Sequence, residues 1–71
     1  MIHRTLGDRL KYSLEIRNIK QREFAEKIKT TEVTISRYIN NTRQPKADMI
    51  VRICNTLGIS SDWLLGMIDQ D

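Results

Sequence analysis

Apolar residues along this chain recur at intervals of three and four positions, and short polar stretches separate the groups. Leu6, Leu10 and Leu14 form the first stripe and predict a helix over about Leu6–Arg17. The β-branched residues keep the same helical spacing, and the alternation typical of strands is missing. The pattern therefore predicts an all-α protein.

The central twenty residues predict two short helices joined by a tight turn. We expect one helix over about Gln21–Ile28 and the next over about Glu32–Asn40, with the turn at Lys29 and Thr30 and with Thr31 as a suitable N-cap. The positions expected to be buried are Phe24, Ala25, Ile28, Ile35 and either Tyr38 or Ile39.

Two more helices are expected after Pro45, over about Ala47–Leu57 and from the Ser60 cap to Leu65. Candidates for the core here are Ile50, Ile53, Cys54, Leu57, Trp63 and Leu65. Asparagine or glycine follows four of the five helices, and these residues tolerate the left-handed conformation in which helices often end: Asn18, Asn41, Gly58 and Gly66. Connections of two to six residues describe one compact domain, 1–71, with its core over about 6–66 and a tail at 67–71.

Composition argues against an enzyme and against a metal or cofactor site. A chain of 71 residues buries only about 60% of its unfolded surface, so a pocket for a small ligand is not expected. The single histidine, His3, and the single cysteine, Cys54, are far apart, and no residues near them complete a ligand set or an acid–base pair. We therefore expect no catalytic residue, no metal and no cofactor.

The chain has no apolar run near the roughly 20 residues that span a bilayer, and its charged start does not resemble a signal peptide. With an unpaired thiol, this predicts a cytoplasmic protein without membrane contact. The net charge is +3, yet residues 60–71 hold three acids and no base, so residues 1–59 carry +6. A basic body with an acidic tail favours a polyanionic partner on one face.

The third helix offers chemistry that suits such a partner. Its outward positions carry short or polar side chains, which let a helix enter the major groove of DNA deeply. Arg37 can bond guanine O6 and N7 together, and Val33 can pack on a thymine methyl group. Glu32 can accept from cytosine N4, or it can simply stabilise the helix N-terminus.

The segments IKQREFAEKIKTTEVTISRYINNTRQP and IVRICNTLGISSDWLLG carry a resemblance to a known family. Their order and spacing are similar to those of the Cro and lambda-repressor family of helix-turn-helix regulators, also called the xenobiotic-response-element type, over about 6–66. The resemblance implies a compact five-helix lambda-repressor-like domain. It also implies base-reading roles for Glu32, Val33, Ser36 and Arg37, and phosphate contacts for Gln21, Thr31, Asn40, Thr42, Arg43 and Lys46.

Three departures from the family pattern predict local structure. The family usually has glycine where this chain has Lys29, so we expect a lysine at positive φ, at a cost of about 1 kcal/mol. Leu14 and Ile39 stand where many relatives carry a buried ion pair, and we expect the two to touch in the core. Ser13 replaces a usual apolar residue, which predicts a slightly rotated or underpacked first helix.

The resemblance implies a two-fold dimer on half-sites about one helical turn apart. A weak dimer patch is expected from Leu64, Met67 and Ile68, and a frayed terminus is the alternative. The leading function is a sequence-specific regulator that binds double-stranded DNA, such as a phage or mobile-element repressor on a palindromic operator; an activator fits equally. The alternative is a protein-binding adaptor or antitoxin that uses the same fold.

Overall fold

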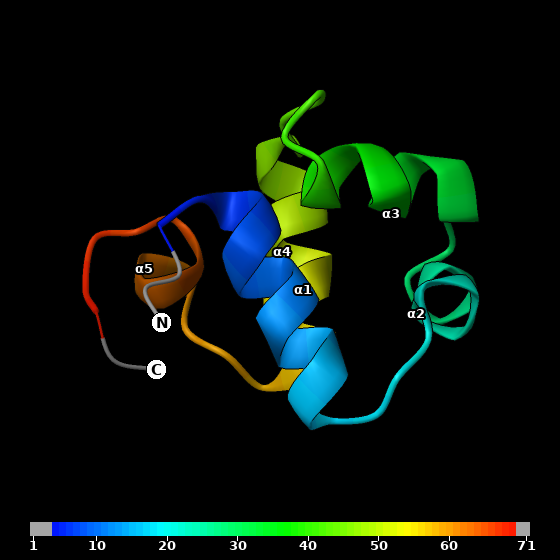
Figure 1. Cartoon of the computed structure of the whole chain (residues 1–71), viewed down its shortest axis with the longest axis horizontal. Coiled ribbons are helices and arrows are strands. Elements are labelled where there is room, and N and C mark those ends of the chain that lie inside the picture. Colours follow the sequence, from blue (N-terminus) through cyan, green and yellow to red (C-terminus); the bar gives the residue numbers. More distant parts are fainter. Residues whose placement is uncertain (1–3, 70–71) are drawn as a thin grey trace.

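The computed structural model describes residues 4–69, which form five α-helices and contain no strand (Figure 1). The prediction of an all-α fold is confirmed, and the helix ends lie within two residues of those expected from the sequence. His3 and the last two residues of the predicted tail lie outside the described residues. The five helices are α1 (Leu6–Ile16), α2 (Gln21–Lys27), α3 (Glu32–Ile39), α4 (Ala47–Leu57) and α5 (Ser61–Leu64).

Side-chain caps fix the start of three of these helices. The Thr31 hydroxyl accepts from the backbone N–H of Thr34, and the Ser60 hydroxyl accepts from two backbone N–H groups of α5. Thr5 caps α1 in the same way, through the N–H of Asp8. Each bond satisfies a donor that the helix itself leaves without an acceptor. The predicted caps at Thr31 and Ser60 are therefore confirmed.

Each of the five helices is followed within two residues by one in the left-handed conformation. These are the five positive-φ positions among residues 4–69: Asn18 (55°), Lys29 (61°), Asn41 (61°), Gly58 (66°) and Gly66 (85°). After α3, the N–H of Asn41 bonds to the carbonyl of Tyr38, and the N–H of Thr42 bonds to that of Arg37. This pair of bonds is the Schellman arrangement, which lets the chain leave a helix sharply. The expected positive φ at Lys29 is confirmed.

All five helices contribute to one core: α2 adds Phe24 and Ala25 and packs against α3, while α1 packs against both α3 and α5 (Figure 1). The fully or nearly fully buried apolar side chains include those expected from the helical stripes: Leu10, Leu14, Phe24, Ala25, Ile28, Ile35, Tyr38, Ile50, Ile53, Cys54, Leu57 and Trp63. Within residues 4–69 the longest helices have eleven residues, and none has the length and apolar character needed to span a membrane.

The end of the chain corrects one prediction. Leu65 was expected in the core and is 52% exposed, whereas Leu64 was expected on the surface and is fully buried. Successive residues of a helix differ by about 100° in direction, so an error of one position reverses inside and outside. A helix of only four residues, α5, offers too few positions for the apolar spacing to fix its phase.

Leu14 on α1 and Ile39 on α3 both border the core, and their direct contact stays a prediction. Leu14 is buried, Ile39 is half-buried against the core, and both line the same hollow between α1 and α3. Neither side chain is turned to solvent. An apolar pair here avoids the cost of removing two charges from water.

Ser13 lies on the side of α1 that faces the core. Its side chain is fully buried, and the hydroxyl oxygen has no hydrogen-bond partner. A slight rotation or underpacking of α1 therefore stays a prediction, and what the structure shows at this position is a hydroxyl without a partner in the core. A buried hydroxyl without a partner lacks the bonds that water gave it in the unfolded chain.

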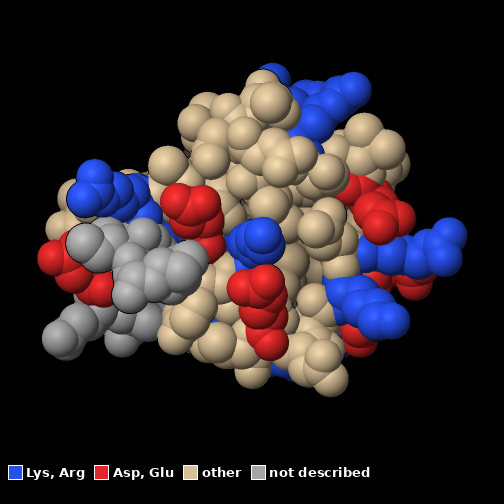
Figure 2. All heavy atoms as spheres, viewed as in Figure 1, with Lys and Arg blue, Asp and Glu red and all other residues tan. Residues whose placement is uncertain are grey.

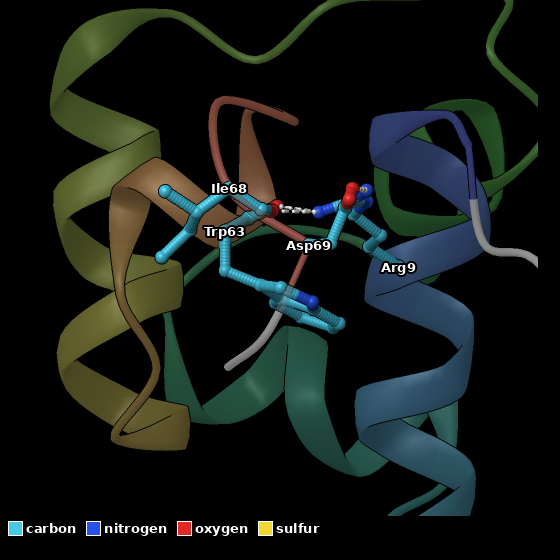
Figure 3. A network of polar contacts seen from close by, with 4 residues as sticks. All are labelled: Arg9, Trp63, Ile68 and Asp69. Atoms are coloured by element: carbon cyan, nitrogen blue, oxygen red, sulfur yellow. Dashed lines mark hydrogen bonds and ion pairs between the residues drawn. The ribbon is translucent and has the colours of Figure 1, made fainter.

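Arg9, which the sequence places beside the first apolar stripe, is buried and holds the end of the chain against α1 (Figure 3). Its Nη1 donates to the carbonyl oxygens of Trp63 at 2.6 Å and of Ile68 at 2.8 Å. The guanidinium also lies 5.4 Å from the centre of the Trp63 ring, in cation–π range. The Asp69 carboxylate approaches Nη2 at 3.8 Å, although Asp69 itself is fully exposed.

Candidate nucleic-acid interface

The two sides of α3 have opposite character. Ile35 and Tyr38 point into the core, while Glu32, Val33 and Arg37 are exposed. The helix lies at the edge of the molecule beside α2, with no other element in front of its outer side (Figure 1). A helix anchored on one side and open on the other has the form needed to enter the DNA major groove.

The expected base-reading residues come together with the first residue of α2. A hollow of about 450 Å³ is lined by Gln21, Glu32, Val33, Ser36 and Arg37. Four of these lie on successive turns of α3, and Gln21 reaches them because α2 and α3 pack against each other next to their short turn. The structure thus gathers all four proposed base readers and one proposed phosphate ligand; their roles remain predictions.

Arg37 has a free guanidinium and a well-fixed backbone. It makes no ion pair within residues 4–69, so its charge faces solvent. Its carbonyl oxygen accepts three bonds, from the N–H and the hydroxyl of Thr42 and from the N–H of Arg43. This arrangement fixes the start of the side chain and also positions the loop that follows α3.

The other proposed phosphate ligands divide into two groups. The Thr31 and Thr42 hydroxyls already serve the two ends of α3, the first as its N-cap and the second as a donor to Arg37. Asn40, Arg43 and Lys46 are exposed, and neither cation forms an ion pair within the described part of the chain. The charged phosphate contacts are therefore expected from Arg43 and Lys46.

Charge on the molecular surface is more mixed than the sequence suggested. Figure 2 shows basic side chains projecting from the side where α2 and α3 lie, with acidic side chains between them. Along α3 and the loop that follows it, residues 32–46, the cations Arg37, Arg43 and Lys46 outnumber the one acid, Glu32. A polyanion would therefore meet separate positive charges around one helix and not a continuous basic face.

The described residues include no group of three or more histidine, cysteine or acidic side chains that could hold a metal ion. Cys54 is buried in α4 and forms no disulfide.

A second exposed surface is apolar. A groove of about 620 Å³ between α4 and α5 is lined by Ala47, Ile50, Val51, Cys54, Asn55, Ile59, Ser61 and Leu65. Val51 and Leu65 are each more than half exposed, and Met67 and Ile68 follow at 73% and 45%. Of the predicted dimer patch, Met67 and Ile68 are thus on the surface. The prediction for Leu64 is wrong, because its side chain is buried in the core. Leu65 and Val51 are the surface residues that the sequence missed.

The chain was compared with known proteins. A model of the helix-turn-helix family, HTH_3, matches residues 10–64. The HTH-type transcriptional regulator ImmR of Bacillus subtilis (strain 168) is 34% identical over 62 residues, which is 87% of this chain and 49% of that protein. The chain therefore spans about half the length of this curated relative.

Solved structures agree on the fold. The P22 c2 repressor in complex with synthetic operator 9T superposes with a TM-score of 0.84 at 21% identity, covering 87% of this chain and 94% of that one. The DNA-binding domain of the P22 c2 repressor in solution gives 0.86 at 20% identity, over 99% and 92% of the two chains. The clp gene regulator ClgR from C. glutamicum gives 0.78 at 19% identity, over 90% and 83%.

Proposed function

The chain belongs to the Cro/C1-type helix-turn-helix family, and from this we propose that it binds double-stranded DNA in a sequence-specific way and regulates transcription. Its family is one of regulators and not of enzymes, in line with the sequence-based expectation. The helix at 32–39 enters the major groove, and the loop after it contacts the backbone. Support comes from relatives described as a transcriptional regulator and as a repressor bound to an operator.

The observation that carries this proposal is the hollow on the open side of α3. It gathers Gln21, Glu32, Val33, Ser36 and Arg37 around a helix whose other side is buried. Short side chains there admit the edges of base pairs, and Arg37 brings a two-pronged donor that fits guanine. A merely solvated helix face would not need a free arginine next to a half-buried glutamine from the preceding helix.

The test begins with selection of bound sites from random duplex DNA, followed by titration of the selected site and a scrambled site over a salt series. Arg37→Ala should reduce the difference in binding free energy between the two duplexes by about 1–3 kcal/mol for each half-site, which is the contribution of one bidentate hydrogen-bonded pair. Lys27→Ala, which removes an exposed positive charge outside the hollow, is the matched control. Equal affinity of the unaltered protein for both duplexes would contradict the proposal.

Arg43 should behave differently from Arg37. As a phosphate ligand it carries no sequence information, so Arg43→Ala should weaken both duplexes by the same factor. If two copies bind, the slope of log K against log salt should fall by about 1.8, because each lost contact contributes about 0.9. A change in discrimination without a change in salt slope would assign Arg43 to base reading.

We further propose that two copies bind a palindromic operator as a weak dimer. Half-sites repeat about every 34 Å along DNA, and the molecule measures 28 × 25 × 23 Å, so two copies on adjacent half-sites are close enough to touch. The α4–α5 groove with Leu65, Met67 and Ile68 is the apolar surface available for that contact.

Analytical ultracentrifugation with and without the selected duplex tests the dimer. Leu65→Ser should weaken cooperative binding and leave the fold intact, because half of this side chain is already exposed. Ile16→Ser, at an equally exposed apolar position on α1 outside the groove, is the control. One copy per palindrome at high micromolar protein would reject the dimer.

Within this function, we propose a repressor of the phage or mobile-element type, by analogy with the P22 c2 repressor. A reporter gene placed behind the selected site separates repression from activation. If no duplex is preferred at any salt concentration, the protein-binding adaptor or antitoxin becomes the better assignment.

A further inference from the structure

The first turn of α1 and the last turn of α3 meet at Gly7. A Cβ atom on Gly7 would stand 2.7 Å from the Tyr38 carbonyl oxygen and closer still to that of Ile39. Only a residue without a side chain allows this approach. The C-terminal end of α3 thus rests directly on the backbone of α1.

Asn41 joins the same two ends through its side chain. Its Oδ1 accepts from the buried N–H of Gly7 at 3.0 Å, and its Nδ2 donates to the Thr5 hydroxyl at 3.0 Å. Thr5 also accepts from the N–H of Asp8, so two residues from distant segments share the capping of α1. The Gly7 N–H is one of the helix donors that has no acceptor within α1 itself.

Asn41 also lies between the proposed base-reading helix and the proposed phosphate-binding loop. It directly precedes Thr42 and Arg43, whose N–H groups both bond to the carbonyl of Arg37. The base-reading helix, the phosphate-binding loop and α1 therefore meet at this residue. A glycine at this turn would offer only backbone, whereas Asn41 has a carboxamide that crosses to α1.

We propose that Asn41 is a positioning residue, whose bonds to Gly7 and Thr5 set the inclination of α3 and thereby the register of Arg37 on DNA. The proposal rests on the DNA-binding function given above. An eight-residue helix is about 12 Å long, so a small movement of its C-terminal end tilts the entire reading surface. A set of side chains that binds a ligand tolerates errors of only about 0.5 Å in the positions of its atoms.

Two substitutions separate the side-chain bonds from the backbone conformation. Asn41→Gly keeps the positive φ and removes the carboxamide, whereas Asn41→Asp keeps an oxygen that can accept from the Gly7 N–H. The matched control is Asn18→Gly, which makes the same change at the end of α1, where the asparagine side chain forms no hydrogen bond to the described residues.

The first measurement, hydrogen exchange of the Gly7 amide by NMR, needs no DNA. Exchange should be at least tenfold faster in Asn41→Gly and unchanged in Asn41→Asp and Asn18→Gly. The second measurement is the ratio of affinities for the selected and scrambled duplexes, well below the melting temperature. This ratio should fall about tenfold in Asn41→Gly and persist in Asn41→Asp, whose added negative charge weakens both duplexes alike.

Each contrary result has a distinct meaning. Unchanged Gly7 exchange in Asn41→Gly would show that the bonds do not hold α1, which overturns the proposal. Faster exchange with an unchanged affinity ratio would make Asn41 a purely structural cap and also overturns it. If the unaltered protein fails to discriminate between duplexes, the DNA-binding function fails, and the positioning role falls with it even when the Gly7 result is as expected.

Discussion

Replacing Ser13 with alanine should stabilise the protein, because the Ser13 hydroxyl is fully buried without a partner. A buried polar group left unpaired costs about 1–3 kcal/mol. Alanine is also more favourable than serine within a helix, by about 0.5 kcal/mol. Loss of one oxygen atom leaves a small void, worth about 0.3 kcal/mol in the other direction.

The net gain from Ser13→Ala is therefore about 1.5 kcal/mol, taking the lower part of the range for the unpaired hydroxyl. For a domain of this size, that raises the melting temperature by about 6–12 °C. Thermal unfolding followed by circular dichroism, and urea unfolding followed by the fluorescence of Trp63, the single tryptophan, should agree on the gain.

Ser61→Ala is the control for this experiment. Ser61 is an exposed helical serine, so its replacement should change stability by no more than about 0.5 kcal/mol. A melting temperature that stays the same or falls in Ser13→Ala, with an unchanged urea m-value, would refute the reasoning. It would mean that the hydroxyl is paired in solution, for example with a carbonyl of the preceding turn.

Four further substitutions test other features of the fold. Lys29→Gly should gain about 1 kcal/mol, since glycine adopts the left-handed conformation without strain; an unchanged or lower melting temperature counts against this. Gly7→Ala should lose about 1–3 kcal/mol through the clash with α3, whereas helix propensity alone predicts a gain of about 1 kcal/mol. Arg9→Met should lose about 2 kcal/mol, because its hydrogen bonds are charge-assisted, and should alter Trp63 fluorescence. Asp69→Asn should leave the melting temperature unchanged, since Asp69 is fully exposed.

The helices and their ends could be predicted because their causes are local. A cap such as Thr31 acts on an N–H three residues away, and a left-handed residue such as Asn18 turns the chain away within two residues of the helix end. The outward face of α3 follows from the same periodicity that buries Ile35 and Tyr38. For this reason four expected base readers appear together around one hollow.

The errors occur where local signals are short or where the partner is remote. Four residues of α5 could not show whether Leu64 or Leu65 faces inward. The polar neighbour of an apolar stripe, Arg9, is buried because carbonyls from the other end of the chain receive it. Such a contact joins residues more than fifty positions apart, so the pattern of residues within α1 does not predict it.

The sequence by itself determined five helices, the caps at Thr31 and Ser60, four of the left-handed residues after helices and a polar surface on the third helix, since each depends on backbone chemistry within a few residues. Only the tertiary structure decided how that third helix is held. Its attachment depends on the absence of a side chain at Gly7 and on two bonds from Asn41, which lies 34 positions away. Residues from distant segments pair in this way because their shapes fit closely and because each supplies a hydrogen-bond group that the other lacks. Neither condition can be met until the helices have come together.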